Sequence, residues 1–476
     1  MSRKITISPV TRIEGHAKIT LQLDDDGVID QAQMHVTQFR GFEKFCEGRP
    51  FYEMPSLMAR TCGICPVSHL IAGAKACDDL LAVQIPHTAK MLRRLMNCAQ
   101  ILQSHALNFF YLSLPDLYFG MDAPPEKRNI IALAKEKPEL ARDGIKLRSI
   151  GQEIIASLGG KRIHPSWVVP GGVNEPLSES HRDEILNRLP EAFKIVQKAI
   201  NWFHSVRDNF KPEIKTFGNF PSHYLGLVDD SGNLEHYDGK LRLVDASGNI
   251  VVDKYDTLKY QELIAEASEP WSYVKFPYFR DLGYPKGMYR VGPLARLNVS
   301  DECGTWKADE ELEKFREGQD GPVASSFHYH WARLIEMMFT VERMEHILND
   351  KDILSKHVRA YAEPNSFEGI GVSEAPRGTL MHHYKIDEHG LITWANLIIA
   401  TGHNNLAINR GIKQVAQSFV EGTEISDGAL NRVEAIVRAF DPCLSCASHA
   451  DGTRPFTVEL RDSNGELLDI RNGTAG

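Results

Sequence analysis

The sequence contains two Cys-x-x-Cys pairs near opposite ends of the chain. The first stands in RTCGICPVSH (60–69) and the second in DPCLSCASHA (441–450), so almost the whole polypeptide separates them. Cysteine binds metals as the thiolate, and four thiolates can close a tetrahedral site around a soft or borderline cation. If both pairs share one ion, the site has to lie at the centre of the fold, because each end of the chain supplies half of the ligands.

Two interpretations of these pairs need no redox-active metal. Structural zinc is the first, because zinc binds four cysteines at this spacing well. Zinc ribbons and fingers, however, bring their cysteines together over a short loop, and the residues that flank the present pairs are more specific than those of zinc knuckles. Thioredoxin-like redox chemistry is the second, but neither pair follows a βαβ pattern. The residues by themselves leave zinc and a redox-active ion open.

Composition and charge narrow the class of protein. The chain has 476 residues, 42% of them hydrophobic and 25% charged, which is enough apolar material for a sizeable core. A net charge of −9 and the lack of a Lys/Arg-rich run argue against nucleic-acid binding. The N-terminal sequence has no apolar segment of a secretory signal, and no stretch approaches the roughly 18 apolar residues of a spanning helix. We therefore expect a cytoplasmic protein without a membrane span.

Four long segments carry apolar residues at helical spacing, namely residues 86–114, 180–215, 324–349 and 410–440. Long helices that each have one apolar stripe are typical of a helical bundle. Cys77 and Cys98 fall on apolar, helix-like segments, where a buried small hydrophobe is the expected role. HYH (328–330) lies on a predicted helix without a partner motif, so we interpret it as structural.

Short alternating runs around Asp-Gly or Asn-Gly turns predict β-hairpins. One lies in the first 40 residues, small hairpins lie inside 222–295, and two more lie at 382–399 and 456–470. HH (382–383) is interpreted as the structural start of a strand. These elements predict an α+β, predominantly α fold, with a long-helix bundle as core, peripheral β-hairpins and a small β-rich insertion.

Around the cysteine pairs, the chain resembles the large, catalytic subunit of nickel–iron hydrogenases. Residues 60–69 match the family's first motif, Arg-x-Cys-Gly-x-Cys-x-x-x-His, and residues 441–449 match its second, Asp-Pro-Cys-x-x-Cys-x-x-His. The likeness spans nearly the full chain, because four further segments also fit: TRIEGH (11–16), RGFEKF (40–45), EAPRG (374–378) and LIIATGHN (397–404).

The resemblance implies a nickel ion held by all four thiolates. Cys62 and Cys443 would be terminal ligands, while Cys65 and Cys446 would bridge to an iron that carries carbon monoxide and cyanide. Splitting dihydrogen into hydride and proton requires a soft Lewis acid and a base beside it. Thiolates stabilise soft metals, and a terminal thiolate can take the proton. Zinc has no redox chemistry and could do only half of this.

The resemblance also assigns roles to charged residues near the metal. Glu14 would relay the proton from Cys443 towards solvent, although a glutamate beside an arginine is usually a surface ion pair. Arg377 would place its guanidinium over the iron and its cyanides, where five fixed donors suit anionic ligands. Its alternative is an ordinary loop arginine. Asp116 and Asp441 match carboxylates near that arginine, which a buried guanidinium needs, and Asp116 could equally cap a helix.

Further residues match the family's metal surroundings. Ala400 and Thr401 resemble the residues that donate hydrogen bonds to a cyanide in this family. His69 resembles the family's hydrogen-bond donor to a bridging sulfur, and the alternative role for His69 is that of a structural core histidine. Glu43 and His449 match the ligands of a second metal, usually magnesium, for which an oxygen ligand, a histidine and waters are plausible.

RTCGICPVSH with DPCLSC most resembles the cytoplasmic, bidirectional, NAD-linked branch of the family. The chain has no GxGxxG after a strand, no P-loop and no cluster-ligand set beyond the two pairs. The resemblance therefore implies iron–sulfur clusters in a small subunit, with FMN and NAD on flavin-containing diaphorase subunits. A related quinone-oxidoreductase subunit without hydrogenase activity is a further alternative, but the intact cysteines argue against it.

The domain organisation follows from the same likeness. Residues 1–449 are expected to form one large catalytic domain, with the β-rich insertion at about 222–295. In this family the chain normally ends at the histidine of the second motif, because an endopeptidase removes an extension after nickel insertion. Here residues 450–476 follow His449, so the sequence is interpreted as that of the precursor. Since FTVELRDSNGELLDI would make a hairpin, a retained, ordered tail is the alternative.

Overall fold

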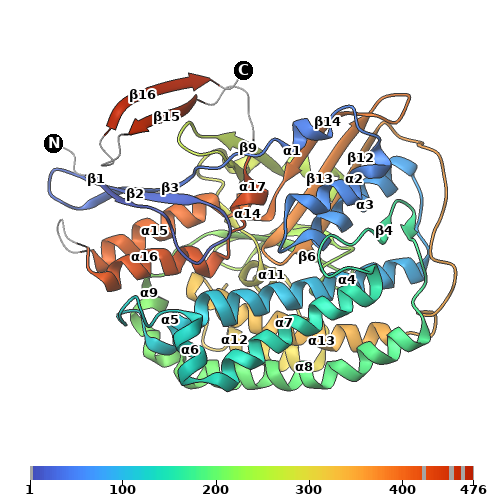
Figure 1. The fold of residues 1–476 in the computed structure, drawn as a ribbon, viewed down its shortest axis with the longest axis horizontal. Coiled ribbons are helices and arrows are strands. Elements are labelled where there is room, and N and C mark those ends of the chain that lie inside the picture. The colour runs from blue at the N-terminus through green and yellow to red at the C-terminus, as the bar shows by residue number, and fades with distance from the viewer. Residues whose placement is uncertain (1–3, 421–424, 450–454, 462–466, 475–476) are drawn as a thin grey trace.

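The computed structural model describes residues 4–420, 425–449, 455–461 and 467–474. Helices predominate in a mixed α+β fold, which confirms the predicted fold class. Long helices lie side by side in one half of the molecule and small sheets occupy the other (Figure 1). The short helices α14 (Ala400–His403) and α17 (Leu444–Ala447) lie between the two halves.

The helical half is built from four long helices, which are α4 (His87–Ala106), α7 (Pro138–Gly159), α8 (Glu179–Val206) and α13 (Tyr329–Leu348). Helix α4 packs against α7 and α13, and α8 packs against the same two helices. Each helix buries one apolar stripe in the shared core, as the periodicity of the sequence predicts for three of them. The predicted bundle is therefore confirmed.

Helix α7 is the long helix that the sequence did not predict. Its interior contains Gly144 and Gly151, which weaken the helical signal because glycine has a low helix propensity. Both glycines serve close packing. A Cβ atom on Gly144 would lie 2.4 Å from Cβ of Phe110, and one on Gly151 would lie 2.8 Å from the carbonyl of Ala99. Tertiary packing thus overrides local propensity here.

The prediction of one helix over residues 410–440 is wrong. The chain forms α15 (Asn405–Phe419) and α16 (Asp427–Phe440), which pack against each other, and residues 421–424 lie outside the described part. Ser426 begins the second helix, because its hydroxyl accepts a hydrogen bond from the Ala429 amide at 3.2 Å.

Helix α4 continues through a π-helical turn (Leu107–Ser113) into α5 (Leu114–Phe119), so the predicted helix at 86–114 is confirmed and extended. Shorter helices connect the main elements. They are α1 (Phe42–Cys46), α2 (Met54–Met58), α3 (Pro66–Leu81), α6 (Ile130–Glu136), α9 (Lys211–Thr216), α10 (Tyr260–Leu263), α11 (Pro293–Val299) and α12 (Trp306–Arg316).

Two regions of the chain confirm predicted hairpins. In the first 40 residues, β1 (Lys4–Ile7), β2 (Ala17–Leu23) and β3 (Ile29–Val36) form a three-stranded sheet in that order. Within 222–295 the strands form a four-stranded sheet and a separate hairpin. The sheet has the order β11 (Tyr289–Arg290), β6 (His223–Val228), β7 (Lys240–Val244) and β8 (Ile250–Tyr255), and the hairpin pairs β9 (Ile264–Ser268) with β10 (Lys275–Phe279).

The predicted hairpin at 382–399 is part of a buried sheet rather than a peripheral one. Strands β12 (Glu368–Ala375), β13 (Gly378–Ile386) and β14 (Ile392–Ile398) pair antiparallel, and nearly all of β13 is buried. Helix α3 covers β12. Residues 382–383 lie in the middle of β13, so the interpretation as a strand start is wrong. A strand with both faces buried lacks the alternation that marks a peripheral hairpin.

The remaining strands are short or lie near the C-terminus. Strands β4 (Val168–Val169) and β5 (Gly172–Val173) form a small pair. Strands β15 (Pro455–Arg461) and β16 (Leu467–Thr474) pair antiparallel, which confirms the predicted hairpin at 456–470, and its turn lies outside the described residues. Among the described helices, none combines the length and apolar character needed to span a membrane.

Candidate metal centre

The first cysteine pair lies in the loop that leads into α3. Cys62 follows a short 3-10 turn, and Cys65 stands directly before the first residue of the helix. The Cys62 sulfur accepts hydrogen bonds from the amides of Ile64 at 3.3 Å and Cys65 at 3.1 Å. From α4, the Nε2 atoms of Gln100 and Gln103 each donate to the Ile64 carbonyl at 2.8 Å. Hydrogen bonds within the loop and from helix α4 therefore fix the conformation of the loop.

The second pair is presented by the turn that ends α16. Asp441 adopts a left-handed conformation, with φ of 54°, and redirects the chain away from the helix axis. The Cys443 amide then donates to the Thr401 hydroxyl at 2.9 Å, and Cys446 lies within α17. The turn thus seats the last cysteine pair against α14.

The structure brings all four cysteines together. Their sulfur atoms lie within 4.8 Å of one another, and all four residues are buried. The sulfur–sulfur distances are 3.0 Å for Cys62 and Cys65, 2.9 Å for Cys443 and Cys446, 3.5 Å for Cys62 and Cys443, and 3.8 Å for Cys65 and Cys446. The predicted convergence of the two pairs is confirmed.

The protonation of these thiols is strongly perturbed. Hydrogen bonds from the other three thiols hold the pKa of Cys65 well below its ordinary value. Hydrogen bonding among the same thiols raises the pKa of Cys443, and burial raises that of Cys446. Four thiolates this close are stable only around a cation, because like charges at such distances repel strongly. The donor set of four sulfurs fits a soft transition metal.

Arg377 lies beside the cysteines, at the tip of the β12–β13 hairpin where a two-residue turn joins Ala375 to Gly378. Its Nε atom donates to the Asp441 carbonyl at 2.6 Å, and its Nη2 atom donates to the Asp441 carboxylate at 3.2 Å. Burial favours a lower pKa for the guanidinium, but Asp441 and the sulfurs of Cys443 and the other cysteines raise it well above its ordinary value. Arg377 is thus a fixed cation at the thiolate group.

Asp116 does not share this partner. Its carboxylate accepts hydrogen bonds from Arg12 at 2.6 Å, from Arg438 at 3.2 Å and from Asn431 at 3.2 Å. The oxygens of Asp116 are thus bonded to other groups than Arg377, and its expected place with Asp441 near Arg377 stays a prediction. It supports the segment of Arg12 that leads to Glu14.

Glu14 reaches the second pair through the main chain of α17. Its carboxylate accepts a hydrogen bond from the Ser445 amide at 3.0 Å, and its carbonyl accepts one from the Leu444 amide at 3.1 Å. Gly15 permits this approach, because its φ is +88° and a Cβ atom there would lie 2.7 Å from Cβ of Leu444. The structure places Glu14 next to the segment of Cys443, in a half-buried position.

The residues expected around the iron are also near the cysteines. Ala400 and Thr401 begin α14 and are buried, and the Thr401 hydroxyl that accepts from Cys443 retains its own proton as a donor. His69, in the first turn of α3, helps to hold the pKa of Cys65 down by hydrogen bonding. Its Nδ1 atom lies 3.2 Å from Nε2 of His382.

Glu43 and His449 form a second group of candidate ligands. The Nδ1 atom of His449 lies 2.8 Å from Oε2 of Glu43, and the Leu397 amide donates to Oε1 at 2.9 Å. The ammonium of Lys275 lies 3.4 Å from the same oxygen. Burial favours a higher pKa for Glu43, but His449 and Lys275 outweigh it and lower the pKa to about 2. A carboxylate and an imidazole side by side fit a hard cation with waters.

Several supporting residues escaped the sequence analysis. Arg12 stands in the TRIEGH segment and could have been found there. Gln100 and Gln103 stand three residues apart and so share one face of helix α4, which is a signal for a polar role on that face. His164 carried no such signal, although its ring lies 2.9 Å from the Cys62 carbonyl.

Comparison with known proteins gives the class. A family model described as nickel-dependent hydrogenase matches residues 40–123 and 228–449, and a model described as HoxL-like matches residues 4–39. The first model covers more than half of the chain and both cysteine pairs. The chain therefore belongs to the nickel-dependent hydrogenase family, as a large subunit, and the zinc-scaffold and quinone-oxidoreductase alternatives are not favoured.

Individual relatives are similar to this chain over almost its whole length. The chain is 43% identical to the NAD-reducing hydrogenase HoxS subunit beta of Cupriavidus necator, over 99% of this chain and 100% of that protein. It is 40% identical to a subunit of the F420-non-reducing hydrogenase of Methanothermobacter thermautotrophicus, over 98% of this chain and 99% of that one.

Solved structures agree. A structure of an NAD+-reducing NiFe hydrogenase in the H2-reduced state has a TM-score of 0.91 and 46% identity, and the match covers 94% of this chain and 99% of that chain. The Ni-Fe-Se hydrogenase of D. vulgaris Hildenborough has a TM-score of 0.79 and 25% identity, over 94% and 100% of the two chains.

Proposed function

We propose that this nickel-dependent hydrogenase chain catalyses the reversible heterolytic cleavage of H2 into protons and electrons, and that the electrons finally reduce NAD. The single observation that carries the catalytic role is the convergence of four buried sulfurs within 4.8 Å. When bound, a nickel–iron centre supplies the soft Lewis acid and the redox capacity that the reaction requires. The four sulfurs of the chain hold that centre.

The proton is handled by Cys443 and Glu14. The Cys443 sulfur would be a base beside the bound metal and could accept the proton. Glu14 lies against the next residues of the same segment, and its carboxyl can take a proton over and pass it towards solvent. A half-buried position suits this role, because it joins the buried sulfur to the outside.

Arg377, Ala400 and Thr401 are proposed to surround the iron, whose ligands would be carbon monoxide and cyanide. Asp441 orients the guanidinium through two hydrogen bonds, so its remaining donors are fixed in space. The Thr401 hydroxyl accepts a hydrogen bond from the Cys443 amide and can still donate its own proton, as a donor to a cyanide would. His69 supports the thiolate form of Cys65.

Glu43 and His449 are proposed to bind a magnesium ion. The adjacent carboxylate and imidazole support the site. The ammonium of Lys275 lies close by and limits the net negative charge of the site. Elemental analysis of the purified complex tests this proposal, because magnesium should be lost in a Glu43→Gln variant and retained in a variant of Glu388, which is exposed in a turn.

The electron route is proposed to leave the chain for partner proteins. The relatives named NAD-reducing hydrogenase support a small iron–sulfur subunit together with diaphorase subunits that carry FMN and NAD. A cytoplasmic location suits a reaction that reduces NAD, because the coenzyme is used there.

Residues 1–449 are proposed to form the mature catalytic domain, with 222–295 as its β-rich insertion. An endopeptidase would remove residues 450–476. The nickel-dependent hydrogenase model matches the chain as far as residue 449, which supports a catalytic domain that ends there. Intact-mass measurement of the chain from the active complex tests the cleavage. A mass that includes residue 476 in active enzyme would contradict it.

The main experiment uses the purified multi-protein complex. Metal analysis should find nickel and iron, the infrared spectrum should contain bands of iron-bound carbon monoxide and cyanide, and H2 should reduce NAD. A Cys446→Ser variant should lose nickel and all activity, because one of the four sulfurs is missing. Zinc without nickel in the wild-type complex would overturn the proposal.

A further inference from the structure

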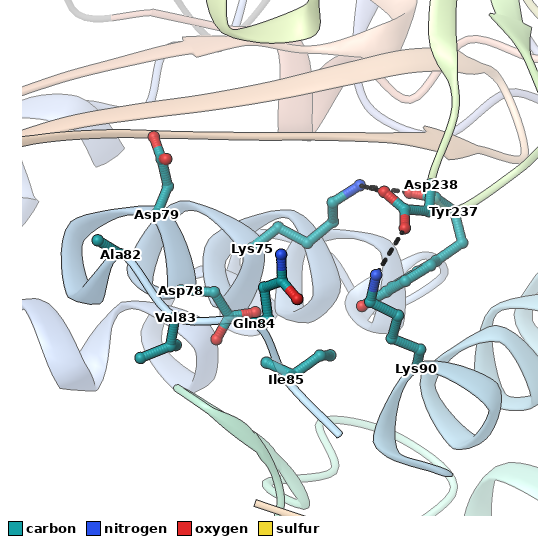
Figure 2. A pocket seen from close by; sticks show the side chains of 10 residues that line it. All are labelled: Lys75, Asp78, Asp79, Ala82, Val83, Gln84, Ile85, Lys90, Tyr237 and Asp238. Atoms are coloured by element: carbon teal, nitrogen blue, oxygen red, sulfur yellow. Dashed lines mark hydrogen bonds and ion pairs between the residues drawn. The ribbon is translucent and has the colours of Figure 1, made fainter. Parts of the chain in front are cut away.

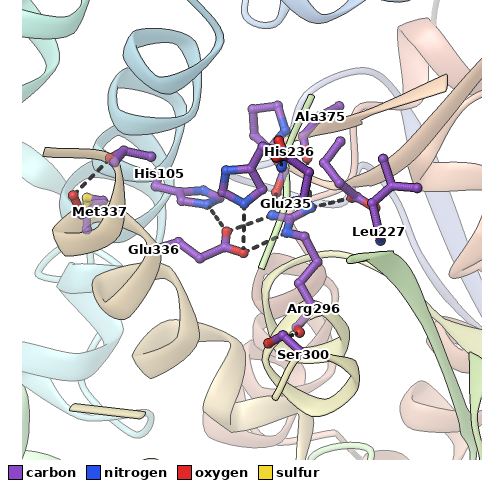
Figure 3. A network of polar contacts seen from close by, with 12 residues as sticks. His105, Leu227, Glu235, His236, Arg296, Ser300, Glu336, Met337 and Ala375 are labelled. Atoms are coloured by element: carbon purple, nitrogen blue, oxygen red, sulfur yellow. Dashed lines mark hydrogen bonds and ion pairs between the residues drawn. The ribbon is translucent and has the colours of Figure 1, made fainter. Parts of the chain in front are cut away.

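A buried charge network (Figure 3) contacts Ala375 and Pro376, the two residues that precede Arg377. At its centre, Arg296 of α11 donates from Nε and Nη2 to the two carboxylate oxygens of Glu336, both at 2.6 Å. Its Nη1 atom donates to the Glu374 carboxylate at 2.7 Å. The side chains of all three residues are fully buried.

The same guanidinium holds the main chain of the turn. Its Nη1 atom also donates to the Ala375 carbonyl at 2.9 Å, and its Nη2 atom donates to the Pro376 carbonyl at 3.2 Å. These residues directly precede Arg377. The five N–H donors of a guanidinium match the five hydrogen bonds of Arg296, so none is left for another task. Gly292, which begins α11, also contacts the turn, since a Cβ atom there would lie 2.8 Å from the Arg377 carbonyl.

The network is anchored in four directions. Glu374 accepts hydrogen bonds from the Thr379 hydroxyl at 2.8 Å and from the Leu227 amide at 3.1 Å. Glu336, on α13, lies 2.7 Å from Nε2 of His105 on α4 and 3.4 Å from Nε2 of His236. Figure 3 shows Glu336 between the Arg296 guanidinium and the rings of His105 and His236. The turn is therefore tied to the rigid helical half.

We propose that Arg296 and Glu336 are positioning residues, which fix the Ala375–Pro376 main chain and thereby aim the Arg377 guanidinium at the metal centre. Glu336 clamps Arg296 through both oxygens, and Arg296 clamps the turn through two carbonyls. A lysine keeps the charge but has three donors and no planar fork, so it cannot reproduce this arrangement. The inference rests on the proposed role of Arg377 beside the metal.

A second buried arginine provides a matched control. Arg93 of α4 donates to the Asp78 carboxylate at 2.6 Å and to the main-chain carbonyls of Val169 at 2.7 Å and Gly172 at 3.1 Å. Its side chain is also fully buried, but the carbonyls that it holds belong to β4 and β5 rather than to the Arg377 turn. Asp78 also lines a surface pocket of about 300 Å³ (Figure 2). In that pocket Lys75 and Lys90 form ion pairs with Asp238.

The experiment compares Arg296→Lys with Arg93→Lys in the whole complex. Nickel content, thermal stability, H2 turnover per nickel and the infrared bands of the iron-bound diatomic ligands are measured. Arg296→Lys should shift or broaden the bands and lower turnover per nickel by about tenfold or more, because small displacements of a positioned group are costly. Arg93→Lys should lower stability and leave bands and turnover per nickel unchanged. Wild-type bands and turnover in Arg296→Lys would overturn the proposal.

A milder variant covers the case in which Arg296→Lys does not load nickel. Thr379→Val removes the hydroxyl donor to Glu374 and leaves every charge in place. It should move the same bands in the same direction by a smaller amount, and bands identical to those of the wild type would overturn the proposal. If the wild-type complex itself lacks nickel and these bands, the proposed function fails, which is a separate result.

Discussion

Arg377 binds Asp441 twice, through the main-chain carbonyl at 2.6 Å and through the carboxylate at 3.2 Å. Because Asp441 stands two residues before Cys443, this contact joins the β12–β13 turn to the second cysteine pair. Both side chains are almost completely buried. Guanidinium, carboxylate and metal ligands therefore form one rigid unit.

Asp441→Asn should destabilise the chain by about 3 kcal/mol, since it leaves a buried guanidinium without its counter-charge. Denaturant unfolding compares the free energies. The control is Asp183→Asn, which breaks an exposed ion pair with Arg182 and should cost less than about 1 kcal/mol. Equal losses of unfolding free energy in the two variants would show that the buried pair stabilises the chain no more than the exposed pair.

Glu14→Gln should lower H2 turnover by about a hundredfold or more, because an amide cannot relay a proton. Its carbonyl oxygen can still accept the Ser445 hydrogen bond, so nickel content and stability should remain close to those of the wild type. Turnover per nickel, measured with an artificial electron acceptor, checks the expectation. Full activity in this variant would exclude Glu14 from the proton route.

Gly15→Ala should reduce nickel loading, because the added Cβ atom would meet Leu444 at 2.7 Å and push the second cysteine pair away. Gly27→Ala is the matched control. Its φ of +80° imposes a similar backbone strain, but nothing lies within 4 Å of the added atom. Metal analysis should find a loss of nickel in the first variant alone. If both retain nickel equally, the close approach of Gly15 is not needed for the site.

Stability should fall in mild acid because of His328. Burial and the nearby Arg207 lower its pKa from 6.5 to about 4. The unfolded chain therefore binds a proton in this window that the folded chain does not, and stability falls as the pH drops from 6.5 through about 4. The complete loss amounts to about 3 kcal/mol.

The His328→Gln variant isolates this contribution. Its unfolding free energy should depend less steeply on pH between 6.5 and 4 than that of the wild type. Melting curves at several pH values provide the measurement. Parallel curves for the two proteins would mean that His328 is protonated equally in the folded and unfolded chains.

Motifs with rigid spacing were predicted well from the sequence. The four cysteines, Arg377 and Glu14 all lie where their motifs suggest, because each motif specifies a local turn or helix start. The partners of charged residues were harder to predict. Asp116 pairs with Arg12 and Arg438, which lie about a hundred and several hundred residues away in the sequence, and any buried guanidinium could have satisfied its charge.

Elements whose local signals conflict with their packing were missed or placed wrongly. Helix α7 contains glycines that local propensity disfavours and that close packing requires. Strand β13 is buried on both faces, so its sequence lacks the alternation of a surface hairpin. His382 was therefore not recognised as a neighbour of His69, although their ring nitrogens are 3.2 Å apart.

The sulfur atoms of Cys62 and Cys443 are 3.5 Å apart but belong to residues separated by 381 positions. An ion bound by both closes nearly the entire polypeptide into a ring. Ring closure removes conformational freedom from the unfolded chain, and the effect grows slowly with ring size. Metal insertion should therefore stabilise even distant helices against unfolding. Removal of the metal by a chelator should let the whole chain unfold in one cooperative step.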